Sequence, residues 1–124
     1  MSKRILVVDD DRGVIRLVTR LLLSEGYEVS SVENGLDALV KLKKEKFDLV
    51  VLDIMMPEIN GYDVCYQLRF NKEYEQIPII LSTVRDQELE DKLGKREDIE
   101  YLQKPIDSKL LLEKINFLLS KKKS

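Results

Sequence analysis

The sequence predicts one α/β domain organised around a parallel β-sheet, and two observations carry this prediction. Short runs of apolar residues without alternation, Ile5–Val8 and Leu49–Leu52, are typical of strands that are buried on both faces. Segments with apolar residues three and four positions apart, which indicate amphipathic helices, follow the strands in turn. Repeated β-α alternation of this kind produces a parallel sheet with right-handed crossovers and helices on both faces.

The first strand leads into an amphipathic helix. Three consecutive acids follow Val8, and Asp11 is placed to cap a helix over 12–23. Gly26 follows closely and suits the end of that helix. Six apolar residues form one stripe that is expected to face the core: Val14, Ile15, Leu17, Val18, Leu21 and Leu22. Three arginines, four residues apart, line the opposite face: Arg12, Arg16 and Arg20.

Turn and cap residues divide the rest of the chain into further strands and helices. Asn34 and Gly35 open one helix, a proline-containing turn over 57–61 precedes another, and Asp107 caps the last. In chain order, the expected elements are a strand over 27–31, a helix to about residue 44, a strand over 49–52, a helix to about residue 70, a strand over 79–82, a short charged helix from residue 84 to about residue 93, a strand over 99–102 and a helix to about residue 119.

Composition narrows the possible functions. The 124 residues are 44% hydrophobic and 35% charged, as expected of a soluble globular domain that is large enough for one core. The formal net charge of −2 provides no basic field for binding nucleic acid. Histidine is absent, which excludes histidine acid–base catalysis, histidine metal ligands and a role as a phosphohistidine donor.

The expected location follows from the cysteine content of the sequence and from its lack of long apolar segments. Cys65 is the only cysteine, so an internal disulfide is impossible and a reducing compartment is expected. The chain has no apolar run near the roughly 18 residues of a membrane-spanning helix, and it has no signal-peptide core. We therefore expect a cytoplasmic protein without membrane insertion.

Polar side chains collect where the predicted strands end. The first strand ends in Asp9 and Asp10, the third in Asp53, the fourth in Thr83 and the fifth in Lys104. Because the carboxyl ends of parallel strands lie on one edge of a sheet, where open α/β sheets bind ligands, these side chains are expected to converge. Three carboxylates at one place repel one another unless a cation lies among them. Oxygen ligands favour Mg²⁺, or alternatively Mn²⁺, over zinc.

This set of groups suits the transfer of a phosphoryl group to a carboxylate. Asp53 could act as the nucleophile and form an aspartyl phosphate. The reaction needs little beyond alignment and neutralisation of the equatorial phosphoryl oxygens. The metal would neutralise one oxygen and Lys104 a second, while the Thr83 hydroxyl and nearby backbone N–H groups would bind the third.

The residues that carry this chemistry also match the motifs of a known family. The matching stretches, each weak alone but highly specific together, are Val8-Asp9-Asp10, Asp53-Ile54-Met55-Met56-Pro57 with Gly61, Pro78-Ile79-Ile80-Leu81-Ser82-Thr83, and Lys104-Pro105. On these residues the chain resembles the receiver domain of two-component response regulators over essentially its whole length. The resemblance implies a three-layer, flavodoxin-like (βα)5 fold with the strand order 2-1-3-4-5.

The resemblance also implies a role for the acids and for one methionine. Asp53 matches the phosphoacceptor, which belongs to the metal site as well. Asp10 is similar to a direct metal ligand and Asp9 to a ligand that acts through water. Met55 matches the position whose backbone carbonyl reaches the metal.

Three further positions match parts of the family's switch. Thr83 resembles the switch hydroxyl, and Lys104 resembles the lysine that pairs with the phosphoryl group. Tyr101, three residues before Lys104, is similar to the switch aromatic residue. The family also implies a cis peptide bond between Lys104 and Pro105, which the proline makes feasible.

The resemblance implies one receiver domain over residues 1–124, with no output domain in this chain, that acts as a phosphoacceptor signalling domain and not as an enzyme with a separate substrate. The expected phosphodonor is a histidine kinase or a histidine phosphotransfer protein, which we hypothesise docks near Arg16 and Arg20. A downstream protein is expected on the fourth helix, fifth strand and last helix, where Leu110 and Phe117 lie opposite the buried stripe. The expected state is a monomer or a weak phosphorylation-dependent dimer without direct nucleic-acid binding.

Three alternatives remain open at this point. A receiver-like scaffold that is never phosphorylated would have the same fold. A phosphohydrolase with an aspartyl-phosphate intermediate needs a second acid two residues after the nucleophile, and this chain has Met55 there. A flavin-binding electron carrier needs a phosphate-binding loop rich in serine, threonine and glycine after the first strand, and this chain has three acids that would repel a phosphate there.

Overall fold

Five parallel strands form one sheet in the computed structural model, which describes residues 2–56, 58–74, 76–83 and 99–121. The strand order across the sheet is β2-β1-β3-β4-β5, as predicted. In chain order, the strands are β1 (Arg4–Val8), β2 (Glu28–Val32), β3 (Leu49–Asp53), β4 (Ile79–Thr83) and β5 (Ile99–Gln103).

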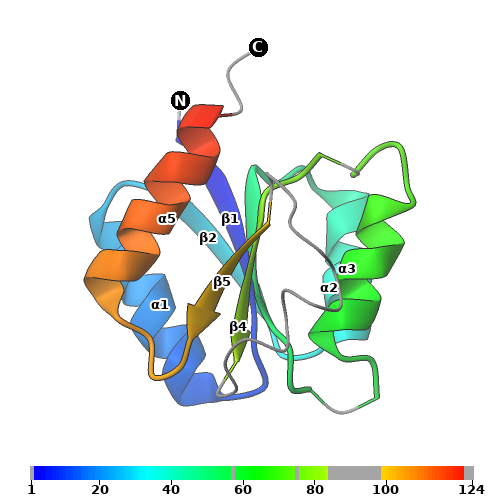
Figure 1. Ribbon diagram of the computed structural model, residues 1–124, viewed down its shortest axis with the longest axis horizontal. Helices are drawn as coiled ribbons and strands as arrows, with labels where there is room; N and C mark the ends of the chain where they lie inside the picture. Colours follow the sequence, from blue (N-terminus) through cyan, green and yellow to red (C-terminus); the bar gives the residue numbers. More distant parts are fainter. Residues whose placement is uncertain (1, 57, 75, 84–98, 122–124) are drawn as a thin grey trace.

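Helices cover both faces of this sheet. The described helices are α1 (Arg12–Ser24), α2 (Gly35–Lys44), α3 (Gly61–Arg69) and α5 (Ser108–Lys121). Helices α1 and α5 lie on one face, and α2 and α3 lie on the other (Figure 1). None of the helices within the described ranges is long and apolar enough to cross a membrane. The helix that we predicted from residue 84 to about residue 93 lies outside the described residues.

The core consists of two layers, one on each face of the sheet. In β1, Leu6 and Val8 pack into the layer that holds residues of α2 and α3, whereas Ile5 and Val7 pack into the layer that holds residues of α1 and α5. The same alternation divides the residues of β3 between the two layers. Burial on both faces explains why these strands have uninterrupted apolar sequences.

Side chains fix the starts of the helices. The Asp11 carboxylate accepts hydrogen bonds from the backbone N–H groups of Gly13 and Val14, which confirms its predicted role as the cap of α1. Asp107 caps α5 in the same way by accepting the N–H of Leu110 at 3.2 Å. Helix α3 starts with a reciprocal capping box between Asn60 and Asp63.

Two predictions need correction. The second strand begins and ends one residue later than predicted, at Glu28 and Val32, because an edge strand that is only partly buried has a weak apolar pattern. Leu17 does not face the core and is 49% exposed. The buried face of α1 is centred on Val18 and Leu22, and successive residues of a helix are rotated by about 100°, so Leu17 points away from it.

Candidate functional site

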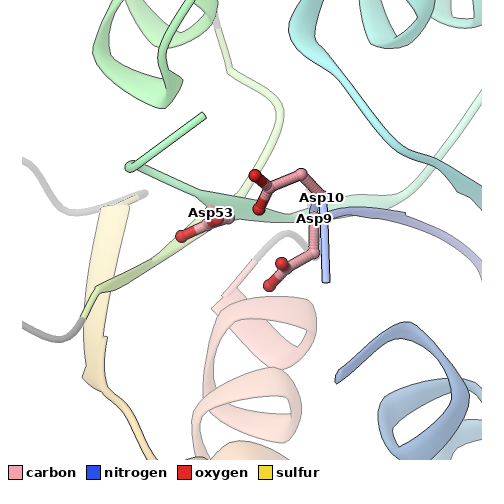
Figure 2. A group of neighbouring side chains, drawn as sticks. All are labelled: Asp9, Asp10 and Asp53. Atoms are coloured by element: carbon pink, nitrogen blue, oxygen red, sulfur yellow. The ribbon is translucent and has the colours of Figure 1, made fainter. Parts of the chain in front are cut away.

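Two neighbouring strands bring three carboxylates together at the carboxyl edge of the sheet. Val8 of β1 lies opposite Leu52 of β3, so Asp9 and Asp53, which follow these residues, lie at the same level along the two strands. Oxygen atoms of Asp9, Asp10 and Asp53 all lie within 4.8 Å of one another. Figure 2 shows the side chains of Asp9 and Asp10, which follow β1, close to that of Asp53 at the end of β3. Asp9 and Asp53 are buried, whereas Asp10 is exposed.

Lys104 reaches the same place from the end of β5. Its Nζ donates a hydrogen bond to Oδ2 of Asp9 at 2.8 Å and lies 3.4 Å from Oδ1 of Asp53. Its backbone N–H donates to the carbonyl of Thr83 at 2.7 Å, which holds the two strand ends together. The peptide bond between Lys104 and Pro105 is cis, as the family resemblance implied.

The surroundings of Asp53 favour its protonated form. Burial, followed by the nearby charge of Asp9, raises the pKa of Asp53 to about 6 from its ordinary value of 3.8. The ammonium of Lys104 and the N–H of Met55, which donates to Oδ1 at 3.3 Å, oppose this rise. Asp53 is therefore ionised near neutral pH, and its ionisation lowers the stability of the folded protein.

Lys104 experiences the opposite influences. Burial works to lower the pKa of its ammonium, but the hydrogen bond to Asp9 and the charges of Asp53 and Asp9 raise it above the ordinary value. The ammonium therefore stays charged across the neutral range. Among the residues that the structure describes, one ammonium lies beside three carboxylates, so these groups together carry excess negative charge.

This donor set fits a hard divalent cation. Carboxylate and backbone carbonyl oxygens are the ligands that Mg²⁺ prefers, and Mg²⁺ keeps several waters when only one or two carboxylates bind it. The described residues within reach offer carboxylates from Asp9, Asp10 and Asp53. The charge excess and the oxygen-only ligands both favour Mg²⁺ over zinc.

The predicted switch residues occupy the two remaining strands at this side of the sheet. Thr83 is the last residue of β4 and is buried, one position beyond Ser82, which lies opposite Asp53. Tyr101 lies within β5 opposite Leu81 and is half-buried. It packs against the core layer that holds residues of α2 and α3, and it precedes Lys104 by three residues.

Sequence reasoning missed one close contact at the site. A Cβ atom placed on Gly61, the first residue of α3, would lie 2.4 Å from the backbone carbonyl oxygen of Asp53. The sequence showed Gly61 only as part of a turn and of a motif. A glycine four residues after a proline gives no signal of which strand its backbone touches.

The family assignment agrees with this geometry. The model of the response regulator receiver domain family matches residues 5–116. The chain belongs to this family. It is 40% identical to protein PilH of Pseudomonas aeruginosa over 118 residues, which cover 94% of this chain and 98% of that protein.

Longer relatives match this receiver domain over part of their length. The chain is 37% identical to the alkaline phosphatase synthesis transcriptional regulatory protein PhoP of Bacillus subtilis, over 96% of this chain and 49% of that protein. It is 40% identical to the response regulator MprA of Mycobacterium tuberculosis, over 99% of this chain and 53% of that protein. The chain therefore spans about half the length of these two regulators.

Solved structures of receiver domains superpose closely on the chain. A chemotaxis protein of Vibrio cholerae has a TM-score of 0.87 at 28% identity, over 95% of this chain and 99% of that chain. A receiver domain of a sensor histidine kinase from Pseudomonas aeruginosa has a TM-score of 0.85 at 23% identity, over 97% of this chain and 99% of that chain, and it holds a magnesium ion in its active-site cleft. These likenesses confirm the predicted flavodoxin-like fold.

Proposed function

We propose that this receiver domain, formed by residues 1–124, accepts a phosphoryl group on Asp53 from a phosphohistidine donor and requires Mg²⁺. The observation that carries the proposal is the position of Asp53, which is 2% exposed, beside the Asp9 carboxylate and 3.4 Å from the Lys104 ammonium. With a pKa of about 6, its carboxylate is ionised at pH 7 and more basic than an ordinary aspartate. These are properties of a carboxylate nucleophile.

In the proposed reaction, an oxygen of Asp53 forms a bond to phosphorus while the bond between phosphorus and the donor imidazole nitrogen breaks. The bonding electron pair leaves with the imidazole. Lys104 neutralises one equatorial oxygen, and the Thr83 hydroxyl binds another. The reaction needs no proton transfer from this chain, which suits a site whose described groups are carboxylates, a hydroxyl and an ammonium.

The metal would be held by oxygen atoms of this chain. We assign Asp10, Asp53 and the backbone carbonyl of Met55 as direct ligands and Asp9 as a ligand through water, with Mn²⁺ as a possible substitute. Mg²⁺, when bound, supplies positive charge that offsets both the crowded carboxylates and the phosphoryl oxygens. Asp9 and Lys104 already form a hydrogen-bonded pair at the edge of this site, which holds both side chains in place.

A labelling experiment tests the proposal. The protein is incubated with Mg²⁺ and acetyl phosphate, and intact mass is measured before and after the incubation. We expect the mass of one phosphoryl group to be added to the wild type and not to Asp53→Asn. Asp37→Asn, which changes an exposed acid of α2 in the same way, is the matched control and should label normally. Absence of labelling in the wild type would overturn the proposal.

We further propose that phosphorylation acts on partner binding through Thr83 and Tyr101. Thr83 would move toward the phosphoryl group, and Tyr101 would move inward and change the surface of the fourth helix, β5 and α5. On this surface, Leu110 and Phe117 of α5 are exposed, as predicted. Thr83→Ala should therefore still be labelled but should lose the phosphorylation dependence of partner binding. A Thr83→Ala variant that switches fully would contradict this part.

The kinase or phosphotransfer protein is proposed to dock on the exposed arginines of α1. Arg12 is already paired with Glu33 at 3.1 Å, whereas Arg16 and Arg20 are exposed without a hydrogen bond or ion pair to the described residues. Reversing the charges of Arg16 and Arg20 should slow transfer from a phosphohistidine protein and leave labelling by acetyl phosphate unchanged. If the charge-reversal variant accepts the phosphoryl group from the phosphohistidine protein as fast as the wild type does, this surface is removed from the proposal.

Other properties of the protein complete the proposal. Cys65 is the only cysteine of the chain and is buried, so it forms no internal disulfide, which fits the reducing cytoplasm that we propose for the protein. We expect a monomer or a weak dimer that forms on phosphorylation, without direct nucleic-acid binding by this domain. Met55 stands where a phosphohydrolase would need its second acid, which supports a signalling role over a hydrolytic one.

A further inference from the structure

The first residue of helix α3, Gly61, packs closely against the backbone of Asp53. A Cβ atom on Gly61 would lie 2.4 Å from the carbonyl oxygen and 3.0 Å from the carbonyl carbon of Asp53, and 2.8 Å from the Cα of Ile54. Carbon and oxygen atoms that are not bonded pack at about 3.5 Å, so a side chain cannot occupy this position without displacing one of the two segments. No rotamer change relieves the contact, because the atoms on both sides belong to the backbone.

Hydrogen bonds hold the loop between β3 and α3 around this contact. The carbonyl of Ile54 accepts the N–H of Met56 at 3.2 Å and the N–H of Gly61 at 3.0 Å. The N–H of Ile54 donates to the carbonyl of Ser82 in β4 at 2.9 Å, which ties the base of the loop to the sheet. The hydrogen bond between Ile54, which follows β3, and Gly61, which begins α3, therefore holds these two elements close together.

Met55 lies within the loop that this pair closes. Its N–H donates to Oδ1 of Asp53 at 3.3 Å, so the loop orients the carboxylate that we propose as phosphoacceptor. Its carbonyl is the proposed backbone ligand of the metal. A displacement of α3 from β3 would move the Met55 backbone, whose N–H contacts the Asp53 carboxylate.

We infer that Gly61 is a positioning residue for the phosphorylation site: the absence of a side chain there sets where the Met55 backbone lies relative to the Asp53 carboxylate. The inference rests on the proposed function, and it adds a residue of α3 that touches neither metal nor phosphoryl group. Glycine is needed at position 61 because two backbone segments approach each other closely there. A left-handed conformation is not the reason, since the φ of Gly61 does not lie in that region.

The test compares Gly61→Ala with Leu68→Ala. Leu68 lies on the same helix, is 2% exposed and packs in the core, so its truncation destabilises the protein without crowding Asp53. We measure the dissociation constant of Mg²⁺ by titration calorimetry, the rate of labelling by acetyl phosphate at saturating Mg²⁺ and donor, and the urea midpoint. All measurements are made at a temperature where each variant is folded.

We expect Gly61→Ala to weaken Mg²⁺ binding and to slow labelling at saturation by about tenfold or more, because displacements near 1 Å cost rates of this size. Leu68→Ala should lower the urea midpoint but retain the wild-type Mg²⁺ affinity and labelling rate. Equal losses in the two variants, or wild-type values in Gly61→Ala, would overturn the inference. So would a Gly61→Ala chain that stays unfolded in a stabilising osmolyte, because Gly61 would then serve the fold itself.

The wild type separates this inference from the proposed function. If the wild type is labelled and Gly61→Ala behaves like it, the inference is wrong and the proposed function stands. If the wild type is not labelled, the proposed function is wrong, and the Mg²⁺ affinities of the two variants still show whether Gly61 positions the metal site.

Discussion

Removing the charge of Asp53 should stabilise the folded protein when no metal is bound. The Asp53 carboxylate is buried beside Asp9, and this raises its pKa to about 6. A carboxyl group with a raised pKa in the folded state binds protons more tightly there than in the unfolded chain. Asp53→Asn keeps the shape of the side chain and removes the charge, so it should abolish this difference.

The magnitude follows from the shift. A rise from 3.8 to about 6 corresponds to about 3 kcal/mol between the protonated and ionised forms. Asp53 loses its proton near its ordinary pKa in the unfolded chain and near pH 6 in the folded protein. Its contribution to the free energy of unfolding is therefore most favourable below about pH 4 and falls as the pH rises to about 6. At pH 7, where the full penalty applies, Asp53→Asn should be more stable than the wild type by an amount on the order of 3 kcal/mol.

Urea unfolding at pH 4, 5, 6, 7 and 8 without divalent ions measures the effect. The chain has no tryptophan, so far-ultraviolet circular dichroism is the suitable probe. The two proteins should have similar stabilities near pH 4 and separate as pH rises. Adding Mg²⁺ should stabilise the wild type more than the variant, because the variant lacks one ligand. Glu113→Gln, which changes an exposed acid of α5, should follow the wild type throughout.

Two results would refute this reasoning. If the urea midpoints of the wild type and Asp53→Asn have the same pH dependence, Asp53 does not titrate near pH 6. If the variant is less stable at pH 7 without metal, the attraction between Asp53 and Lys104 outweighs burial and the repulsion from Asp9.

Three further substitutions have definite expected effects on the urea midpoint. Lys104→Met leaves Asp9 and Asp53 without their shared ammonium, and it should cost about 3 kcal/mol at pH 7 and prevent labelling by acetyl phosphate; retained labelling would contradict the role of Lys104. Tyr74→Phe removes the hydrogen bond from the Tyr74 hydroxyl to the carbonyl of Leu42 at 2.8 Å and should cost about 1 kcal/mol, so an unchanged midpoint would show that water replaces this bond. Gly26→Ala should lower the free energy of unfolding by about 1–2 kcal/mol from backbone strain alone, because Gly26 has a φ of 89° and an added Cβ would meet no other atom. A neutral effect would mean that the backbone after the C-terminal end of α1 changes conformation to relieve the strain.

The parts of the fold that the sequence predicts well are those with a strong local pattern. Strands β1 and β3 are recognisable because both faces are buried, and the acid at the end of each follows directly. The edge strand β2 has a mixed pattern, and its limits were predicted one residue too early. Leu17 was assigned to the core because apolar character does not reveal the width of the buried face of α1.

The convergence of the site residues was predictable, but their geometry was not. Parallel strands end at one edge, so Asp9, Asp10, Asp53 and Lys104 had to lie near one another. Sequence does not reveal that Asp9 is buried while Asp10 is exposed, or that Lys104 donates to Asp9 more closely than it approaches Asp53. The contact of Gly61 depends on how the loop after β3 closes, which residue spacing does not specify.

The charge of the site links its stability to its proposed function. Within the described part of the chain, three carboxylates lie beside one ammonium, and burial raises the free energy of the ionised form of Asp53. A divalent cation would offset the excess negative charge, and phosphorylation would then add negative charge at Asp53 again. Lys104, now held closer to Asp9 than to Asp53, is the described cation that is placed to respond. A shift of Lys104 from Asp9 toward the phosphoryl group would therefore carry the charge change to the end of β5, where Tyr101 lies three residues away.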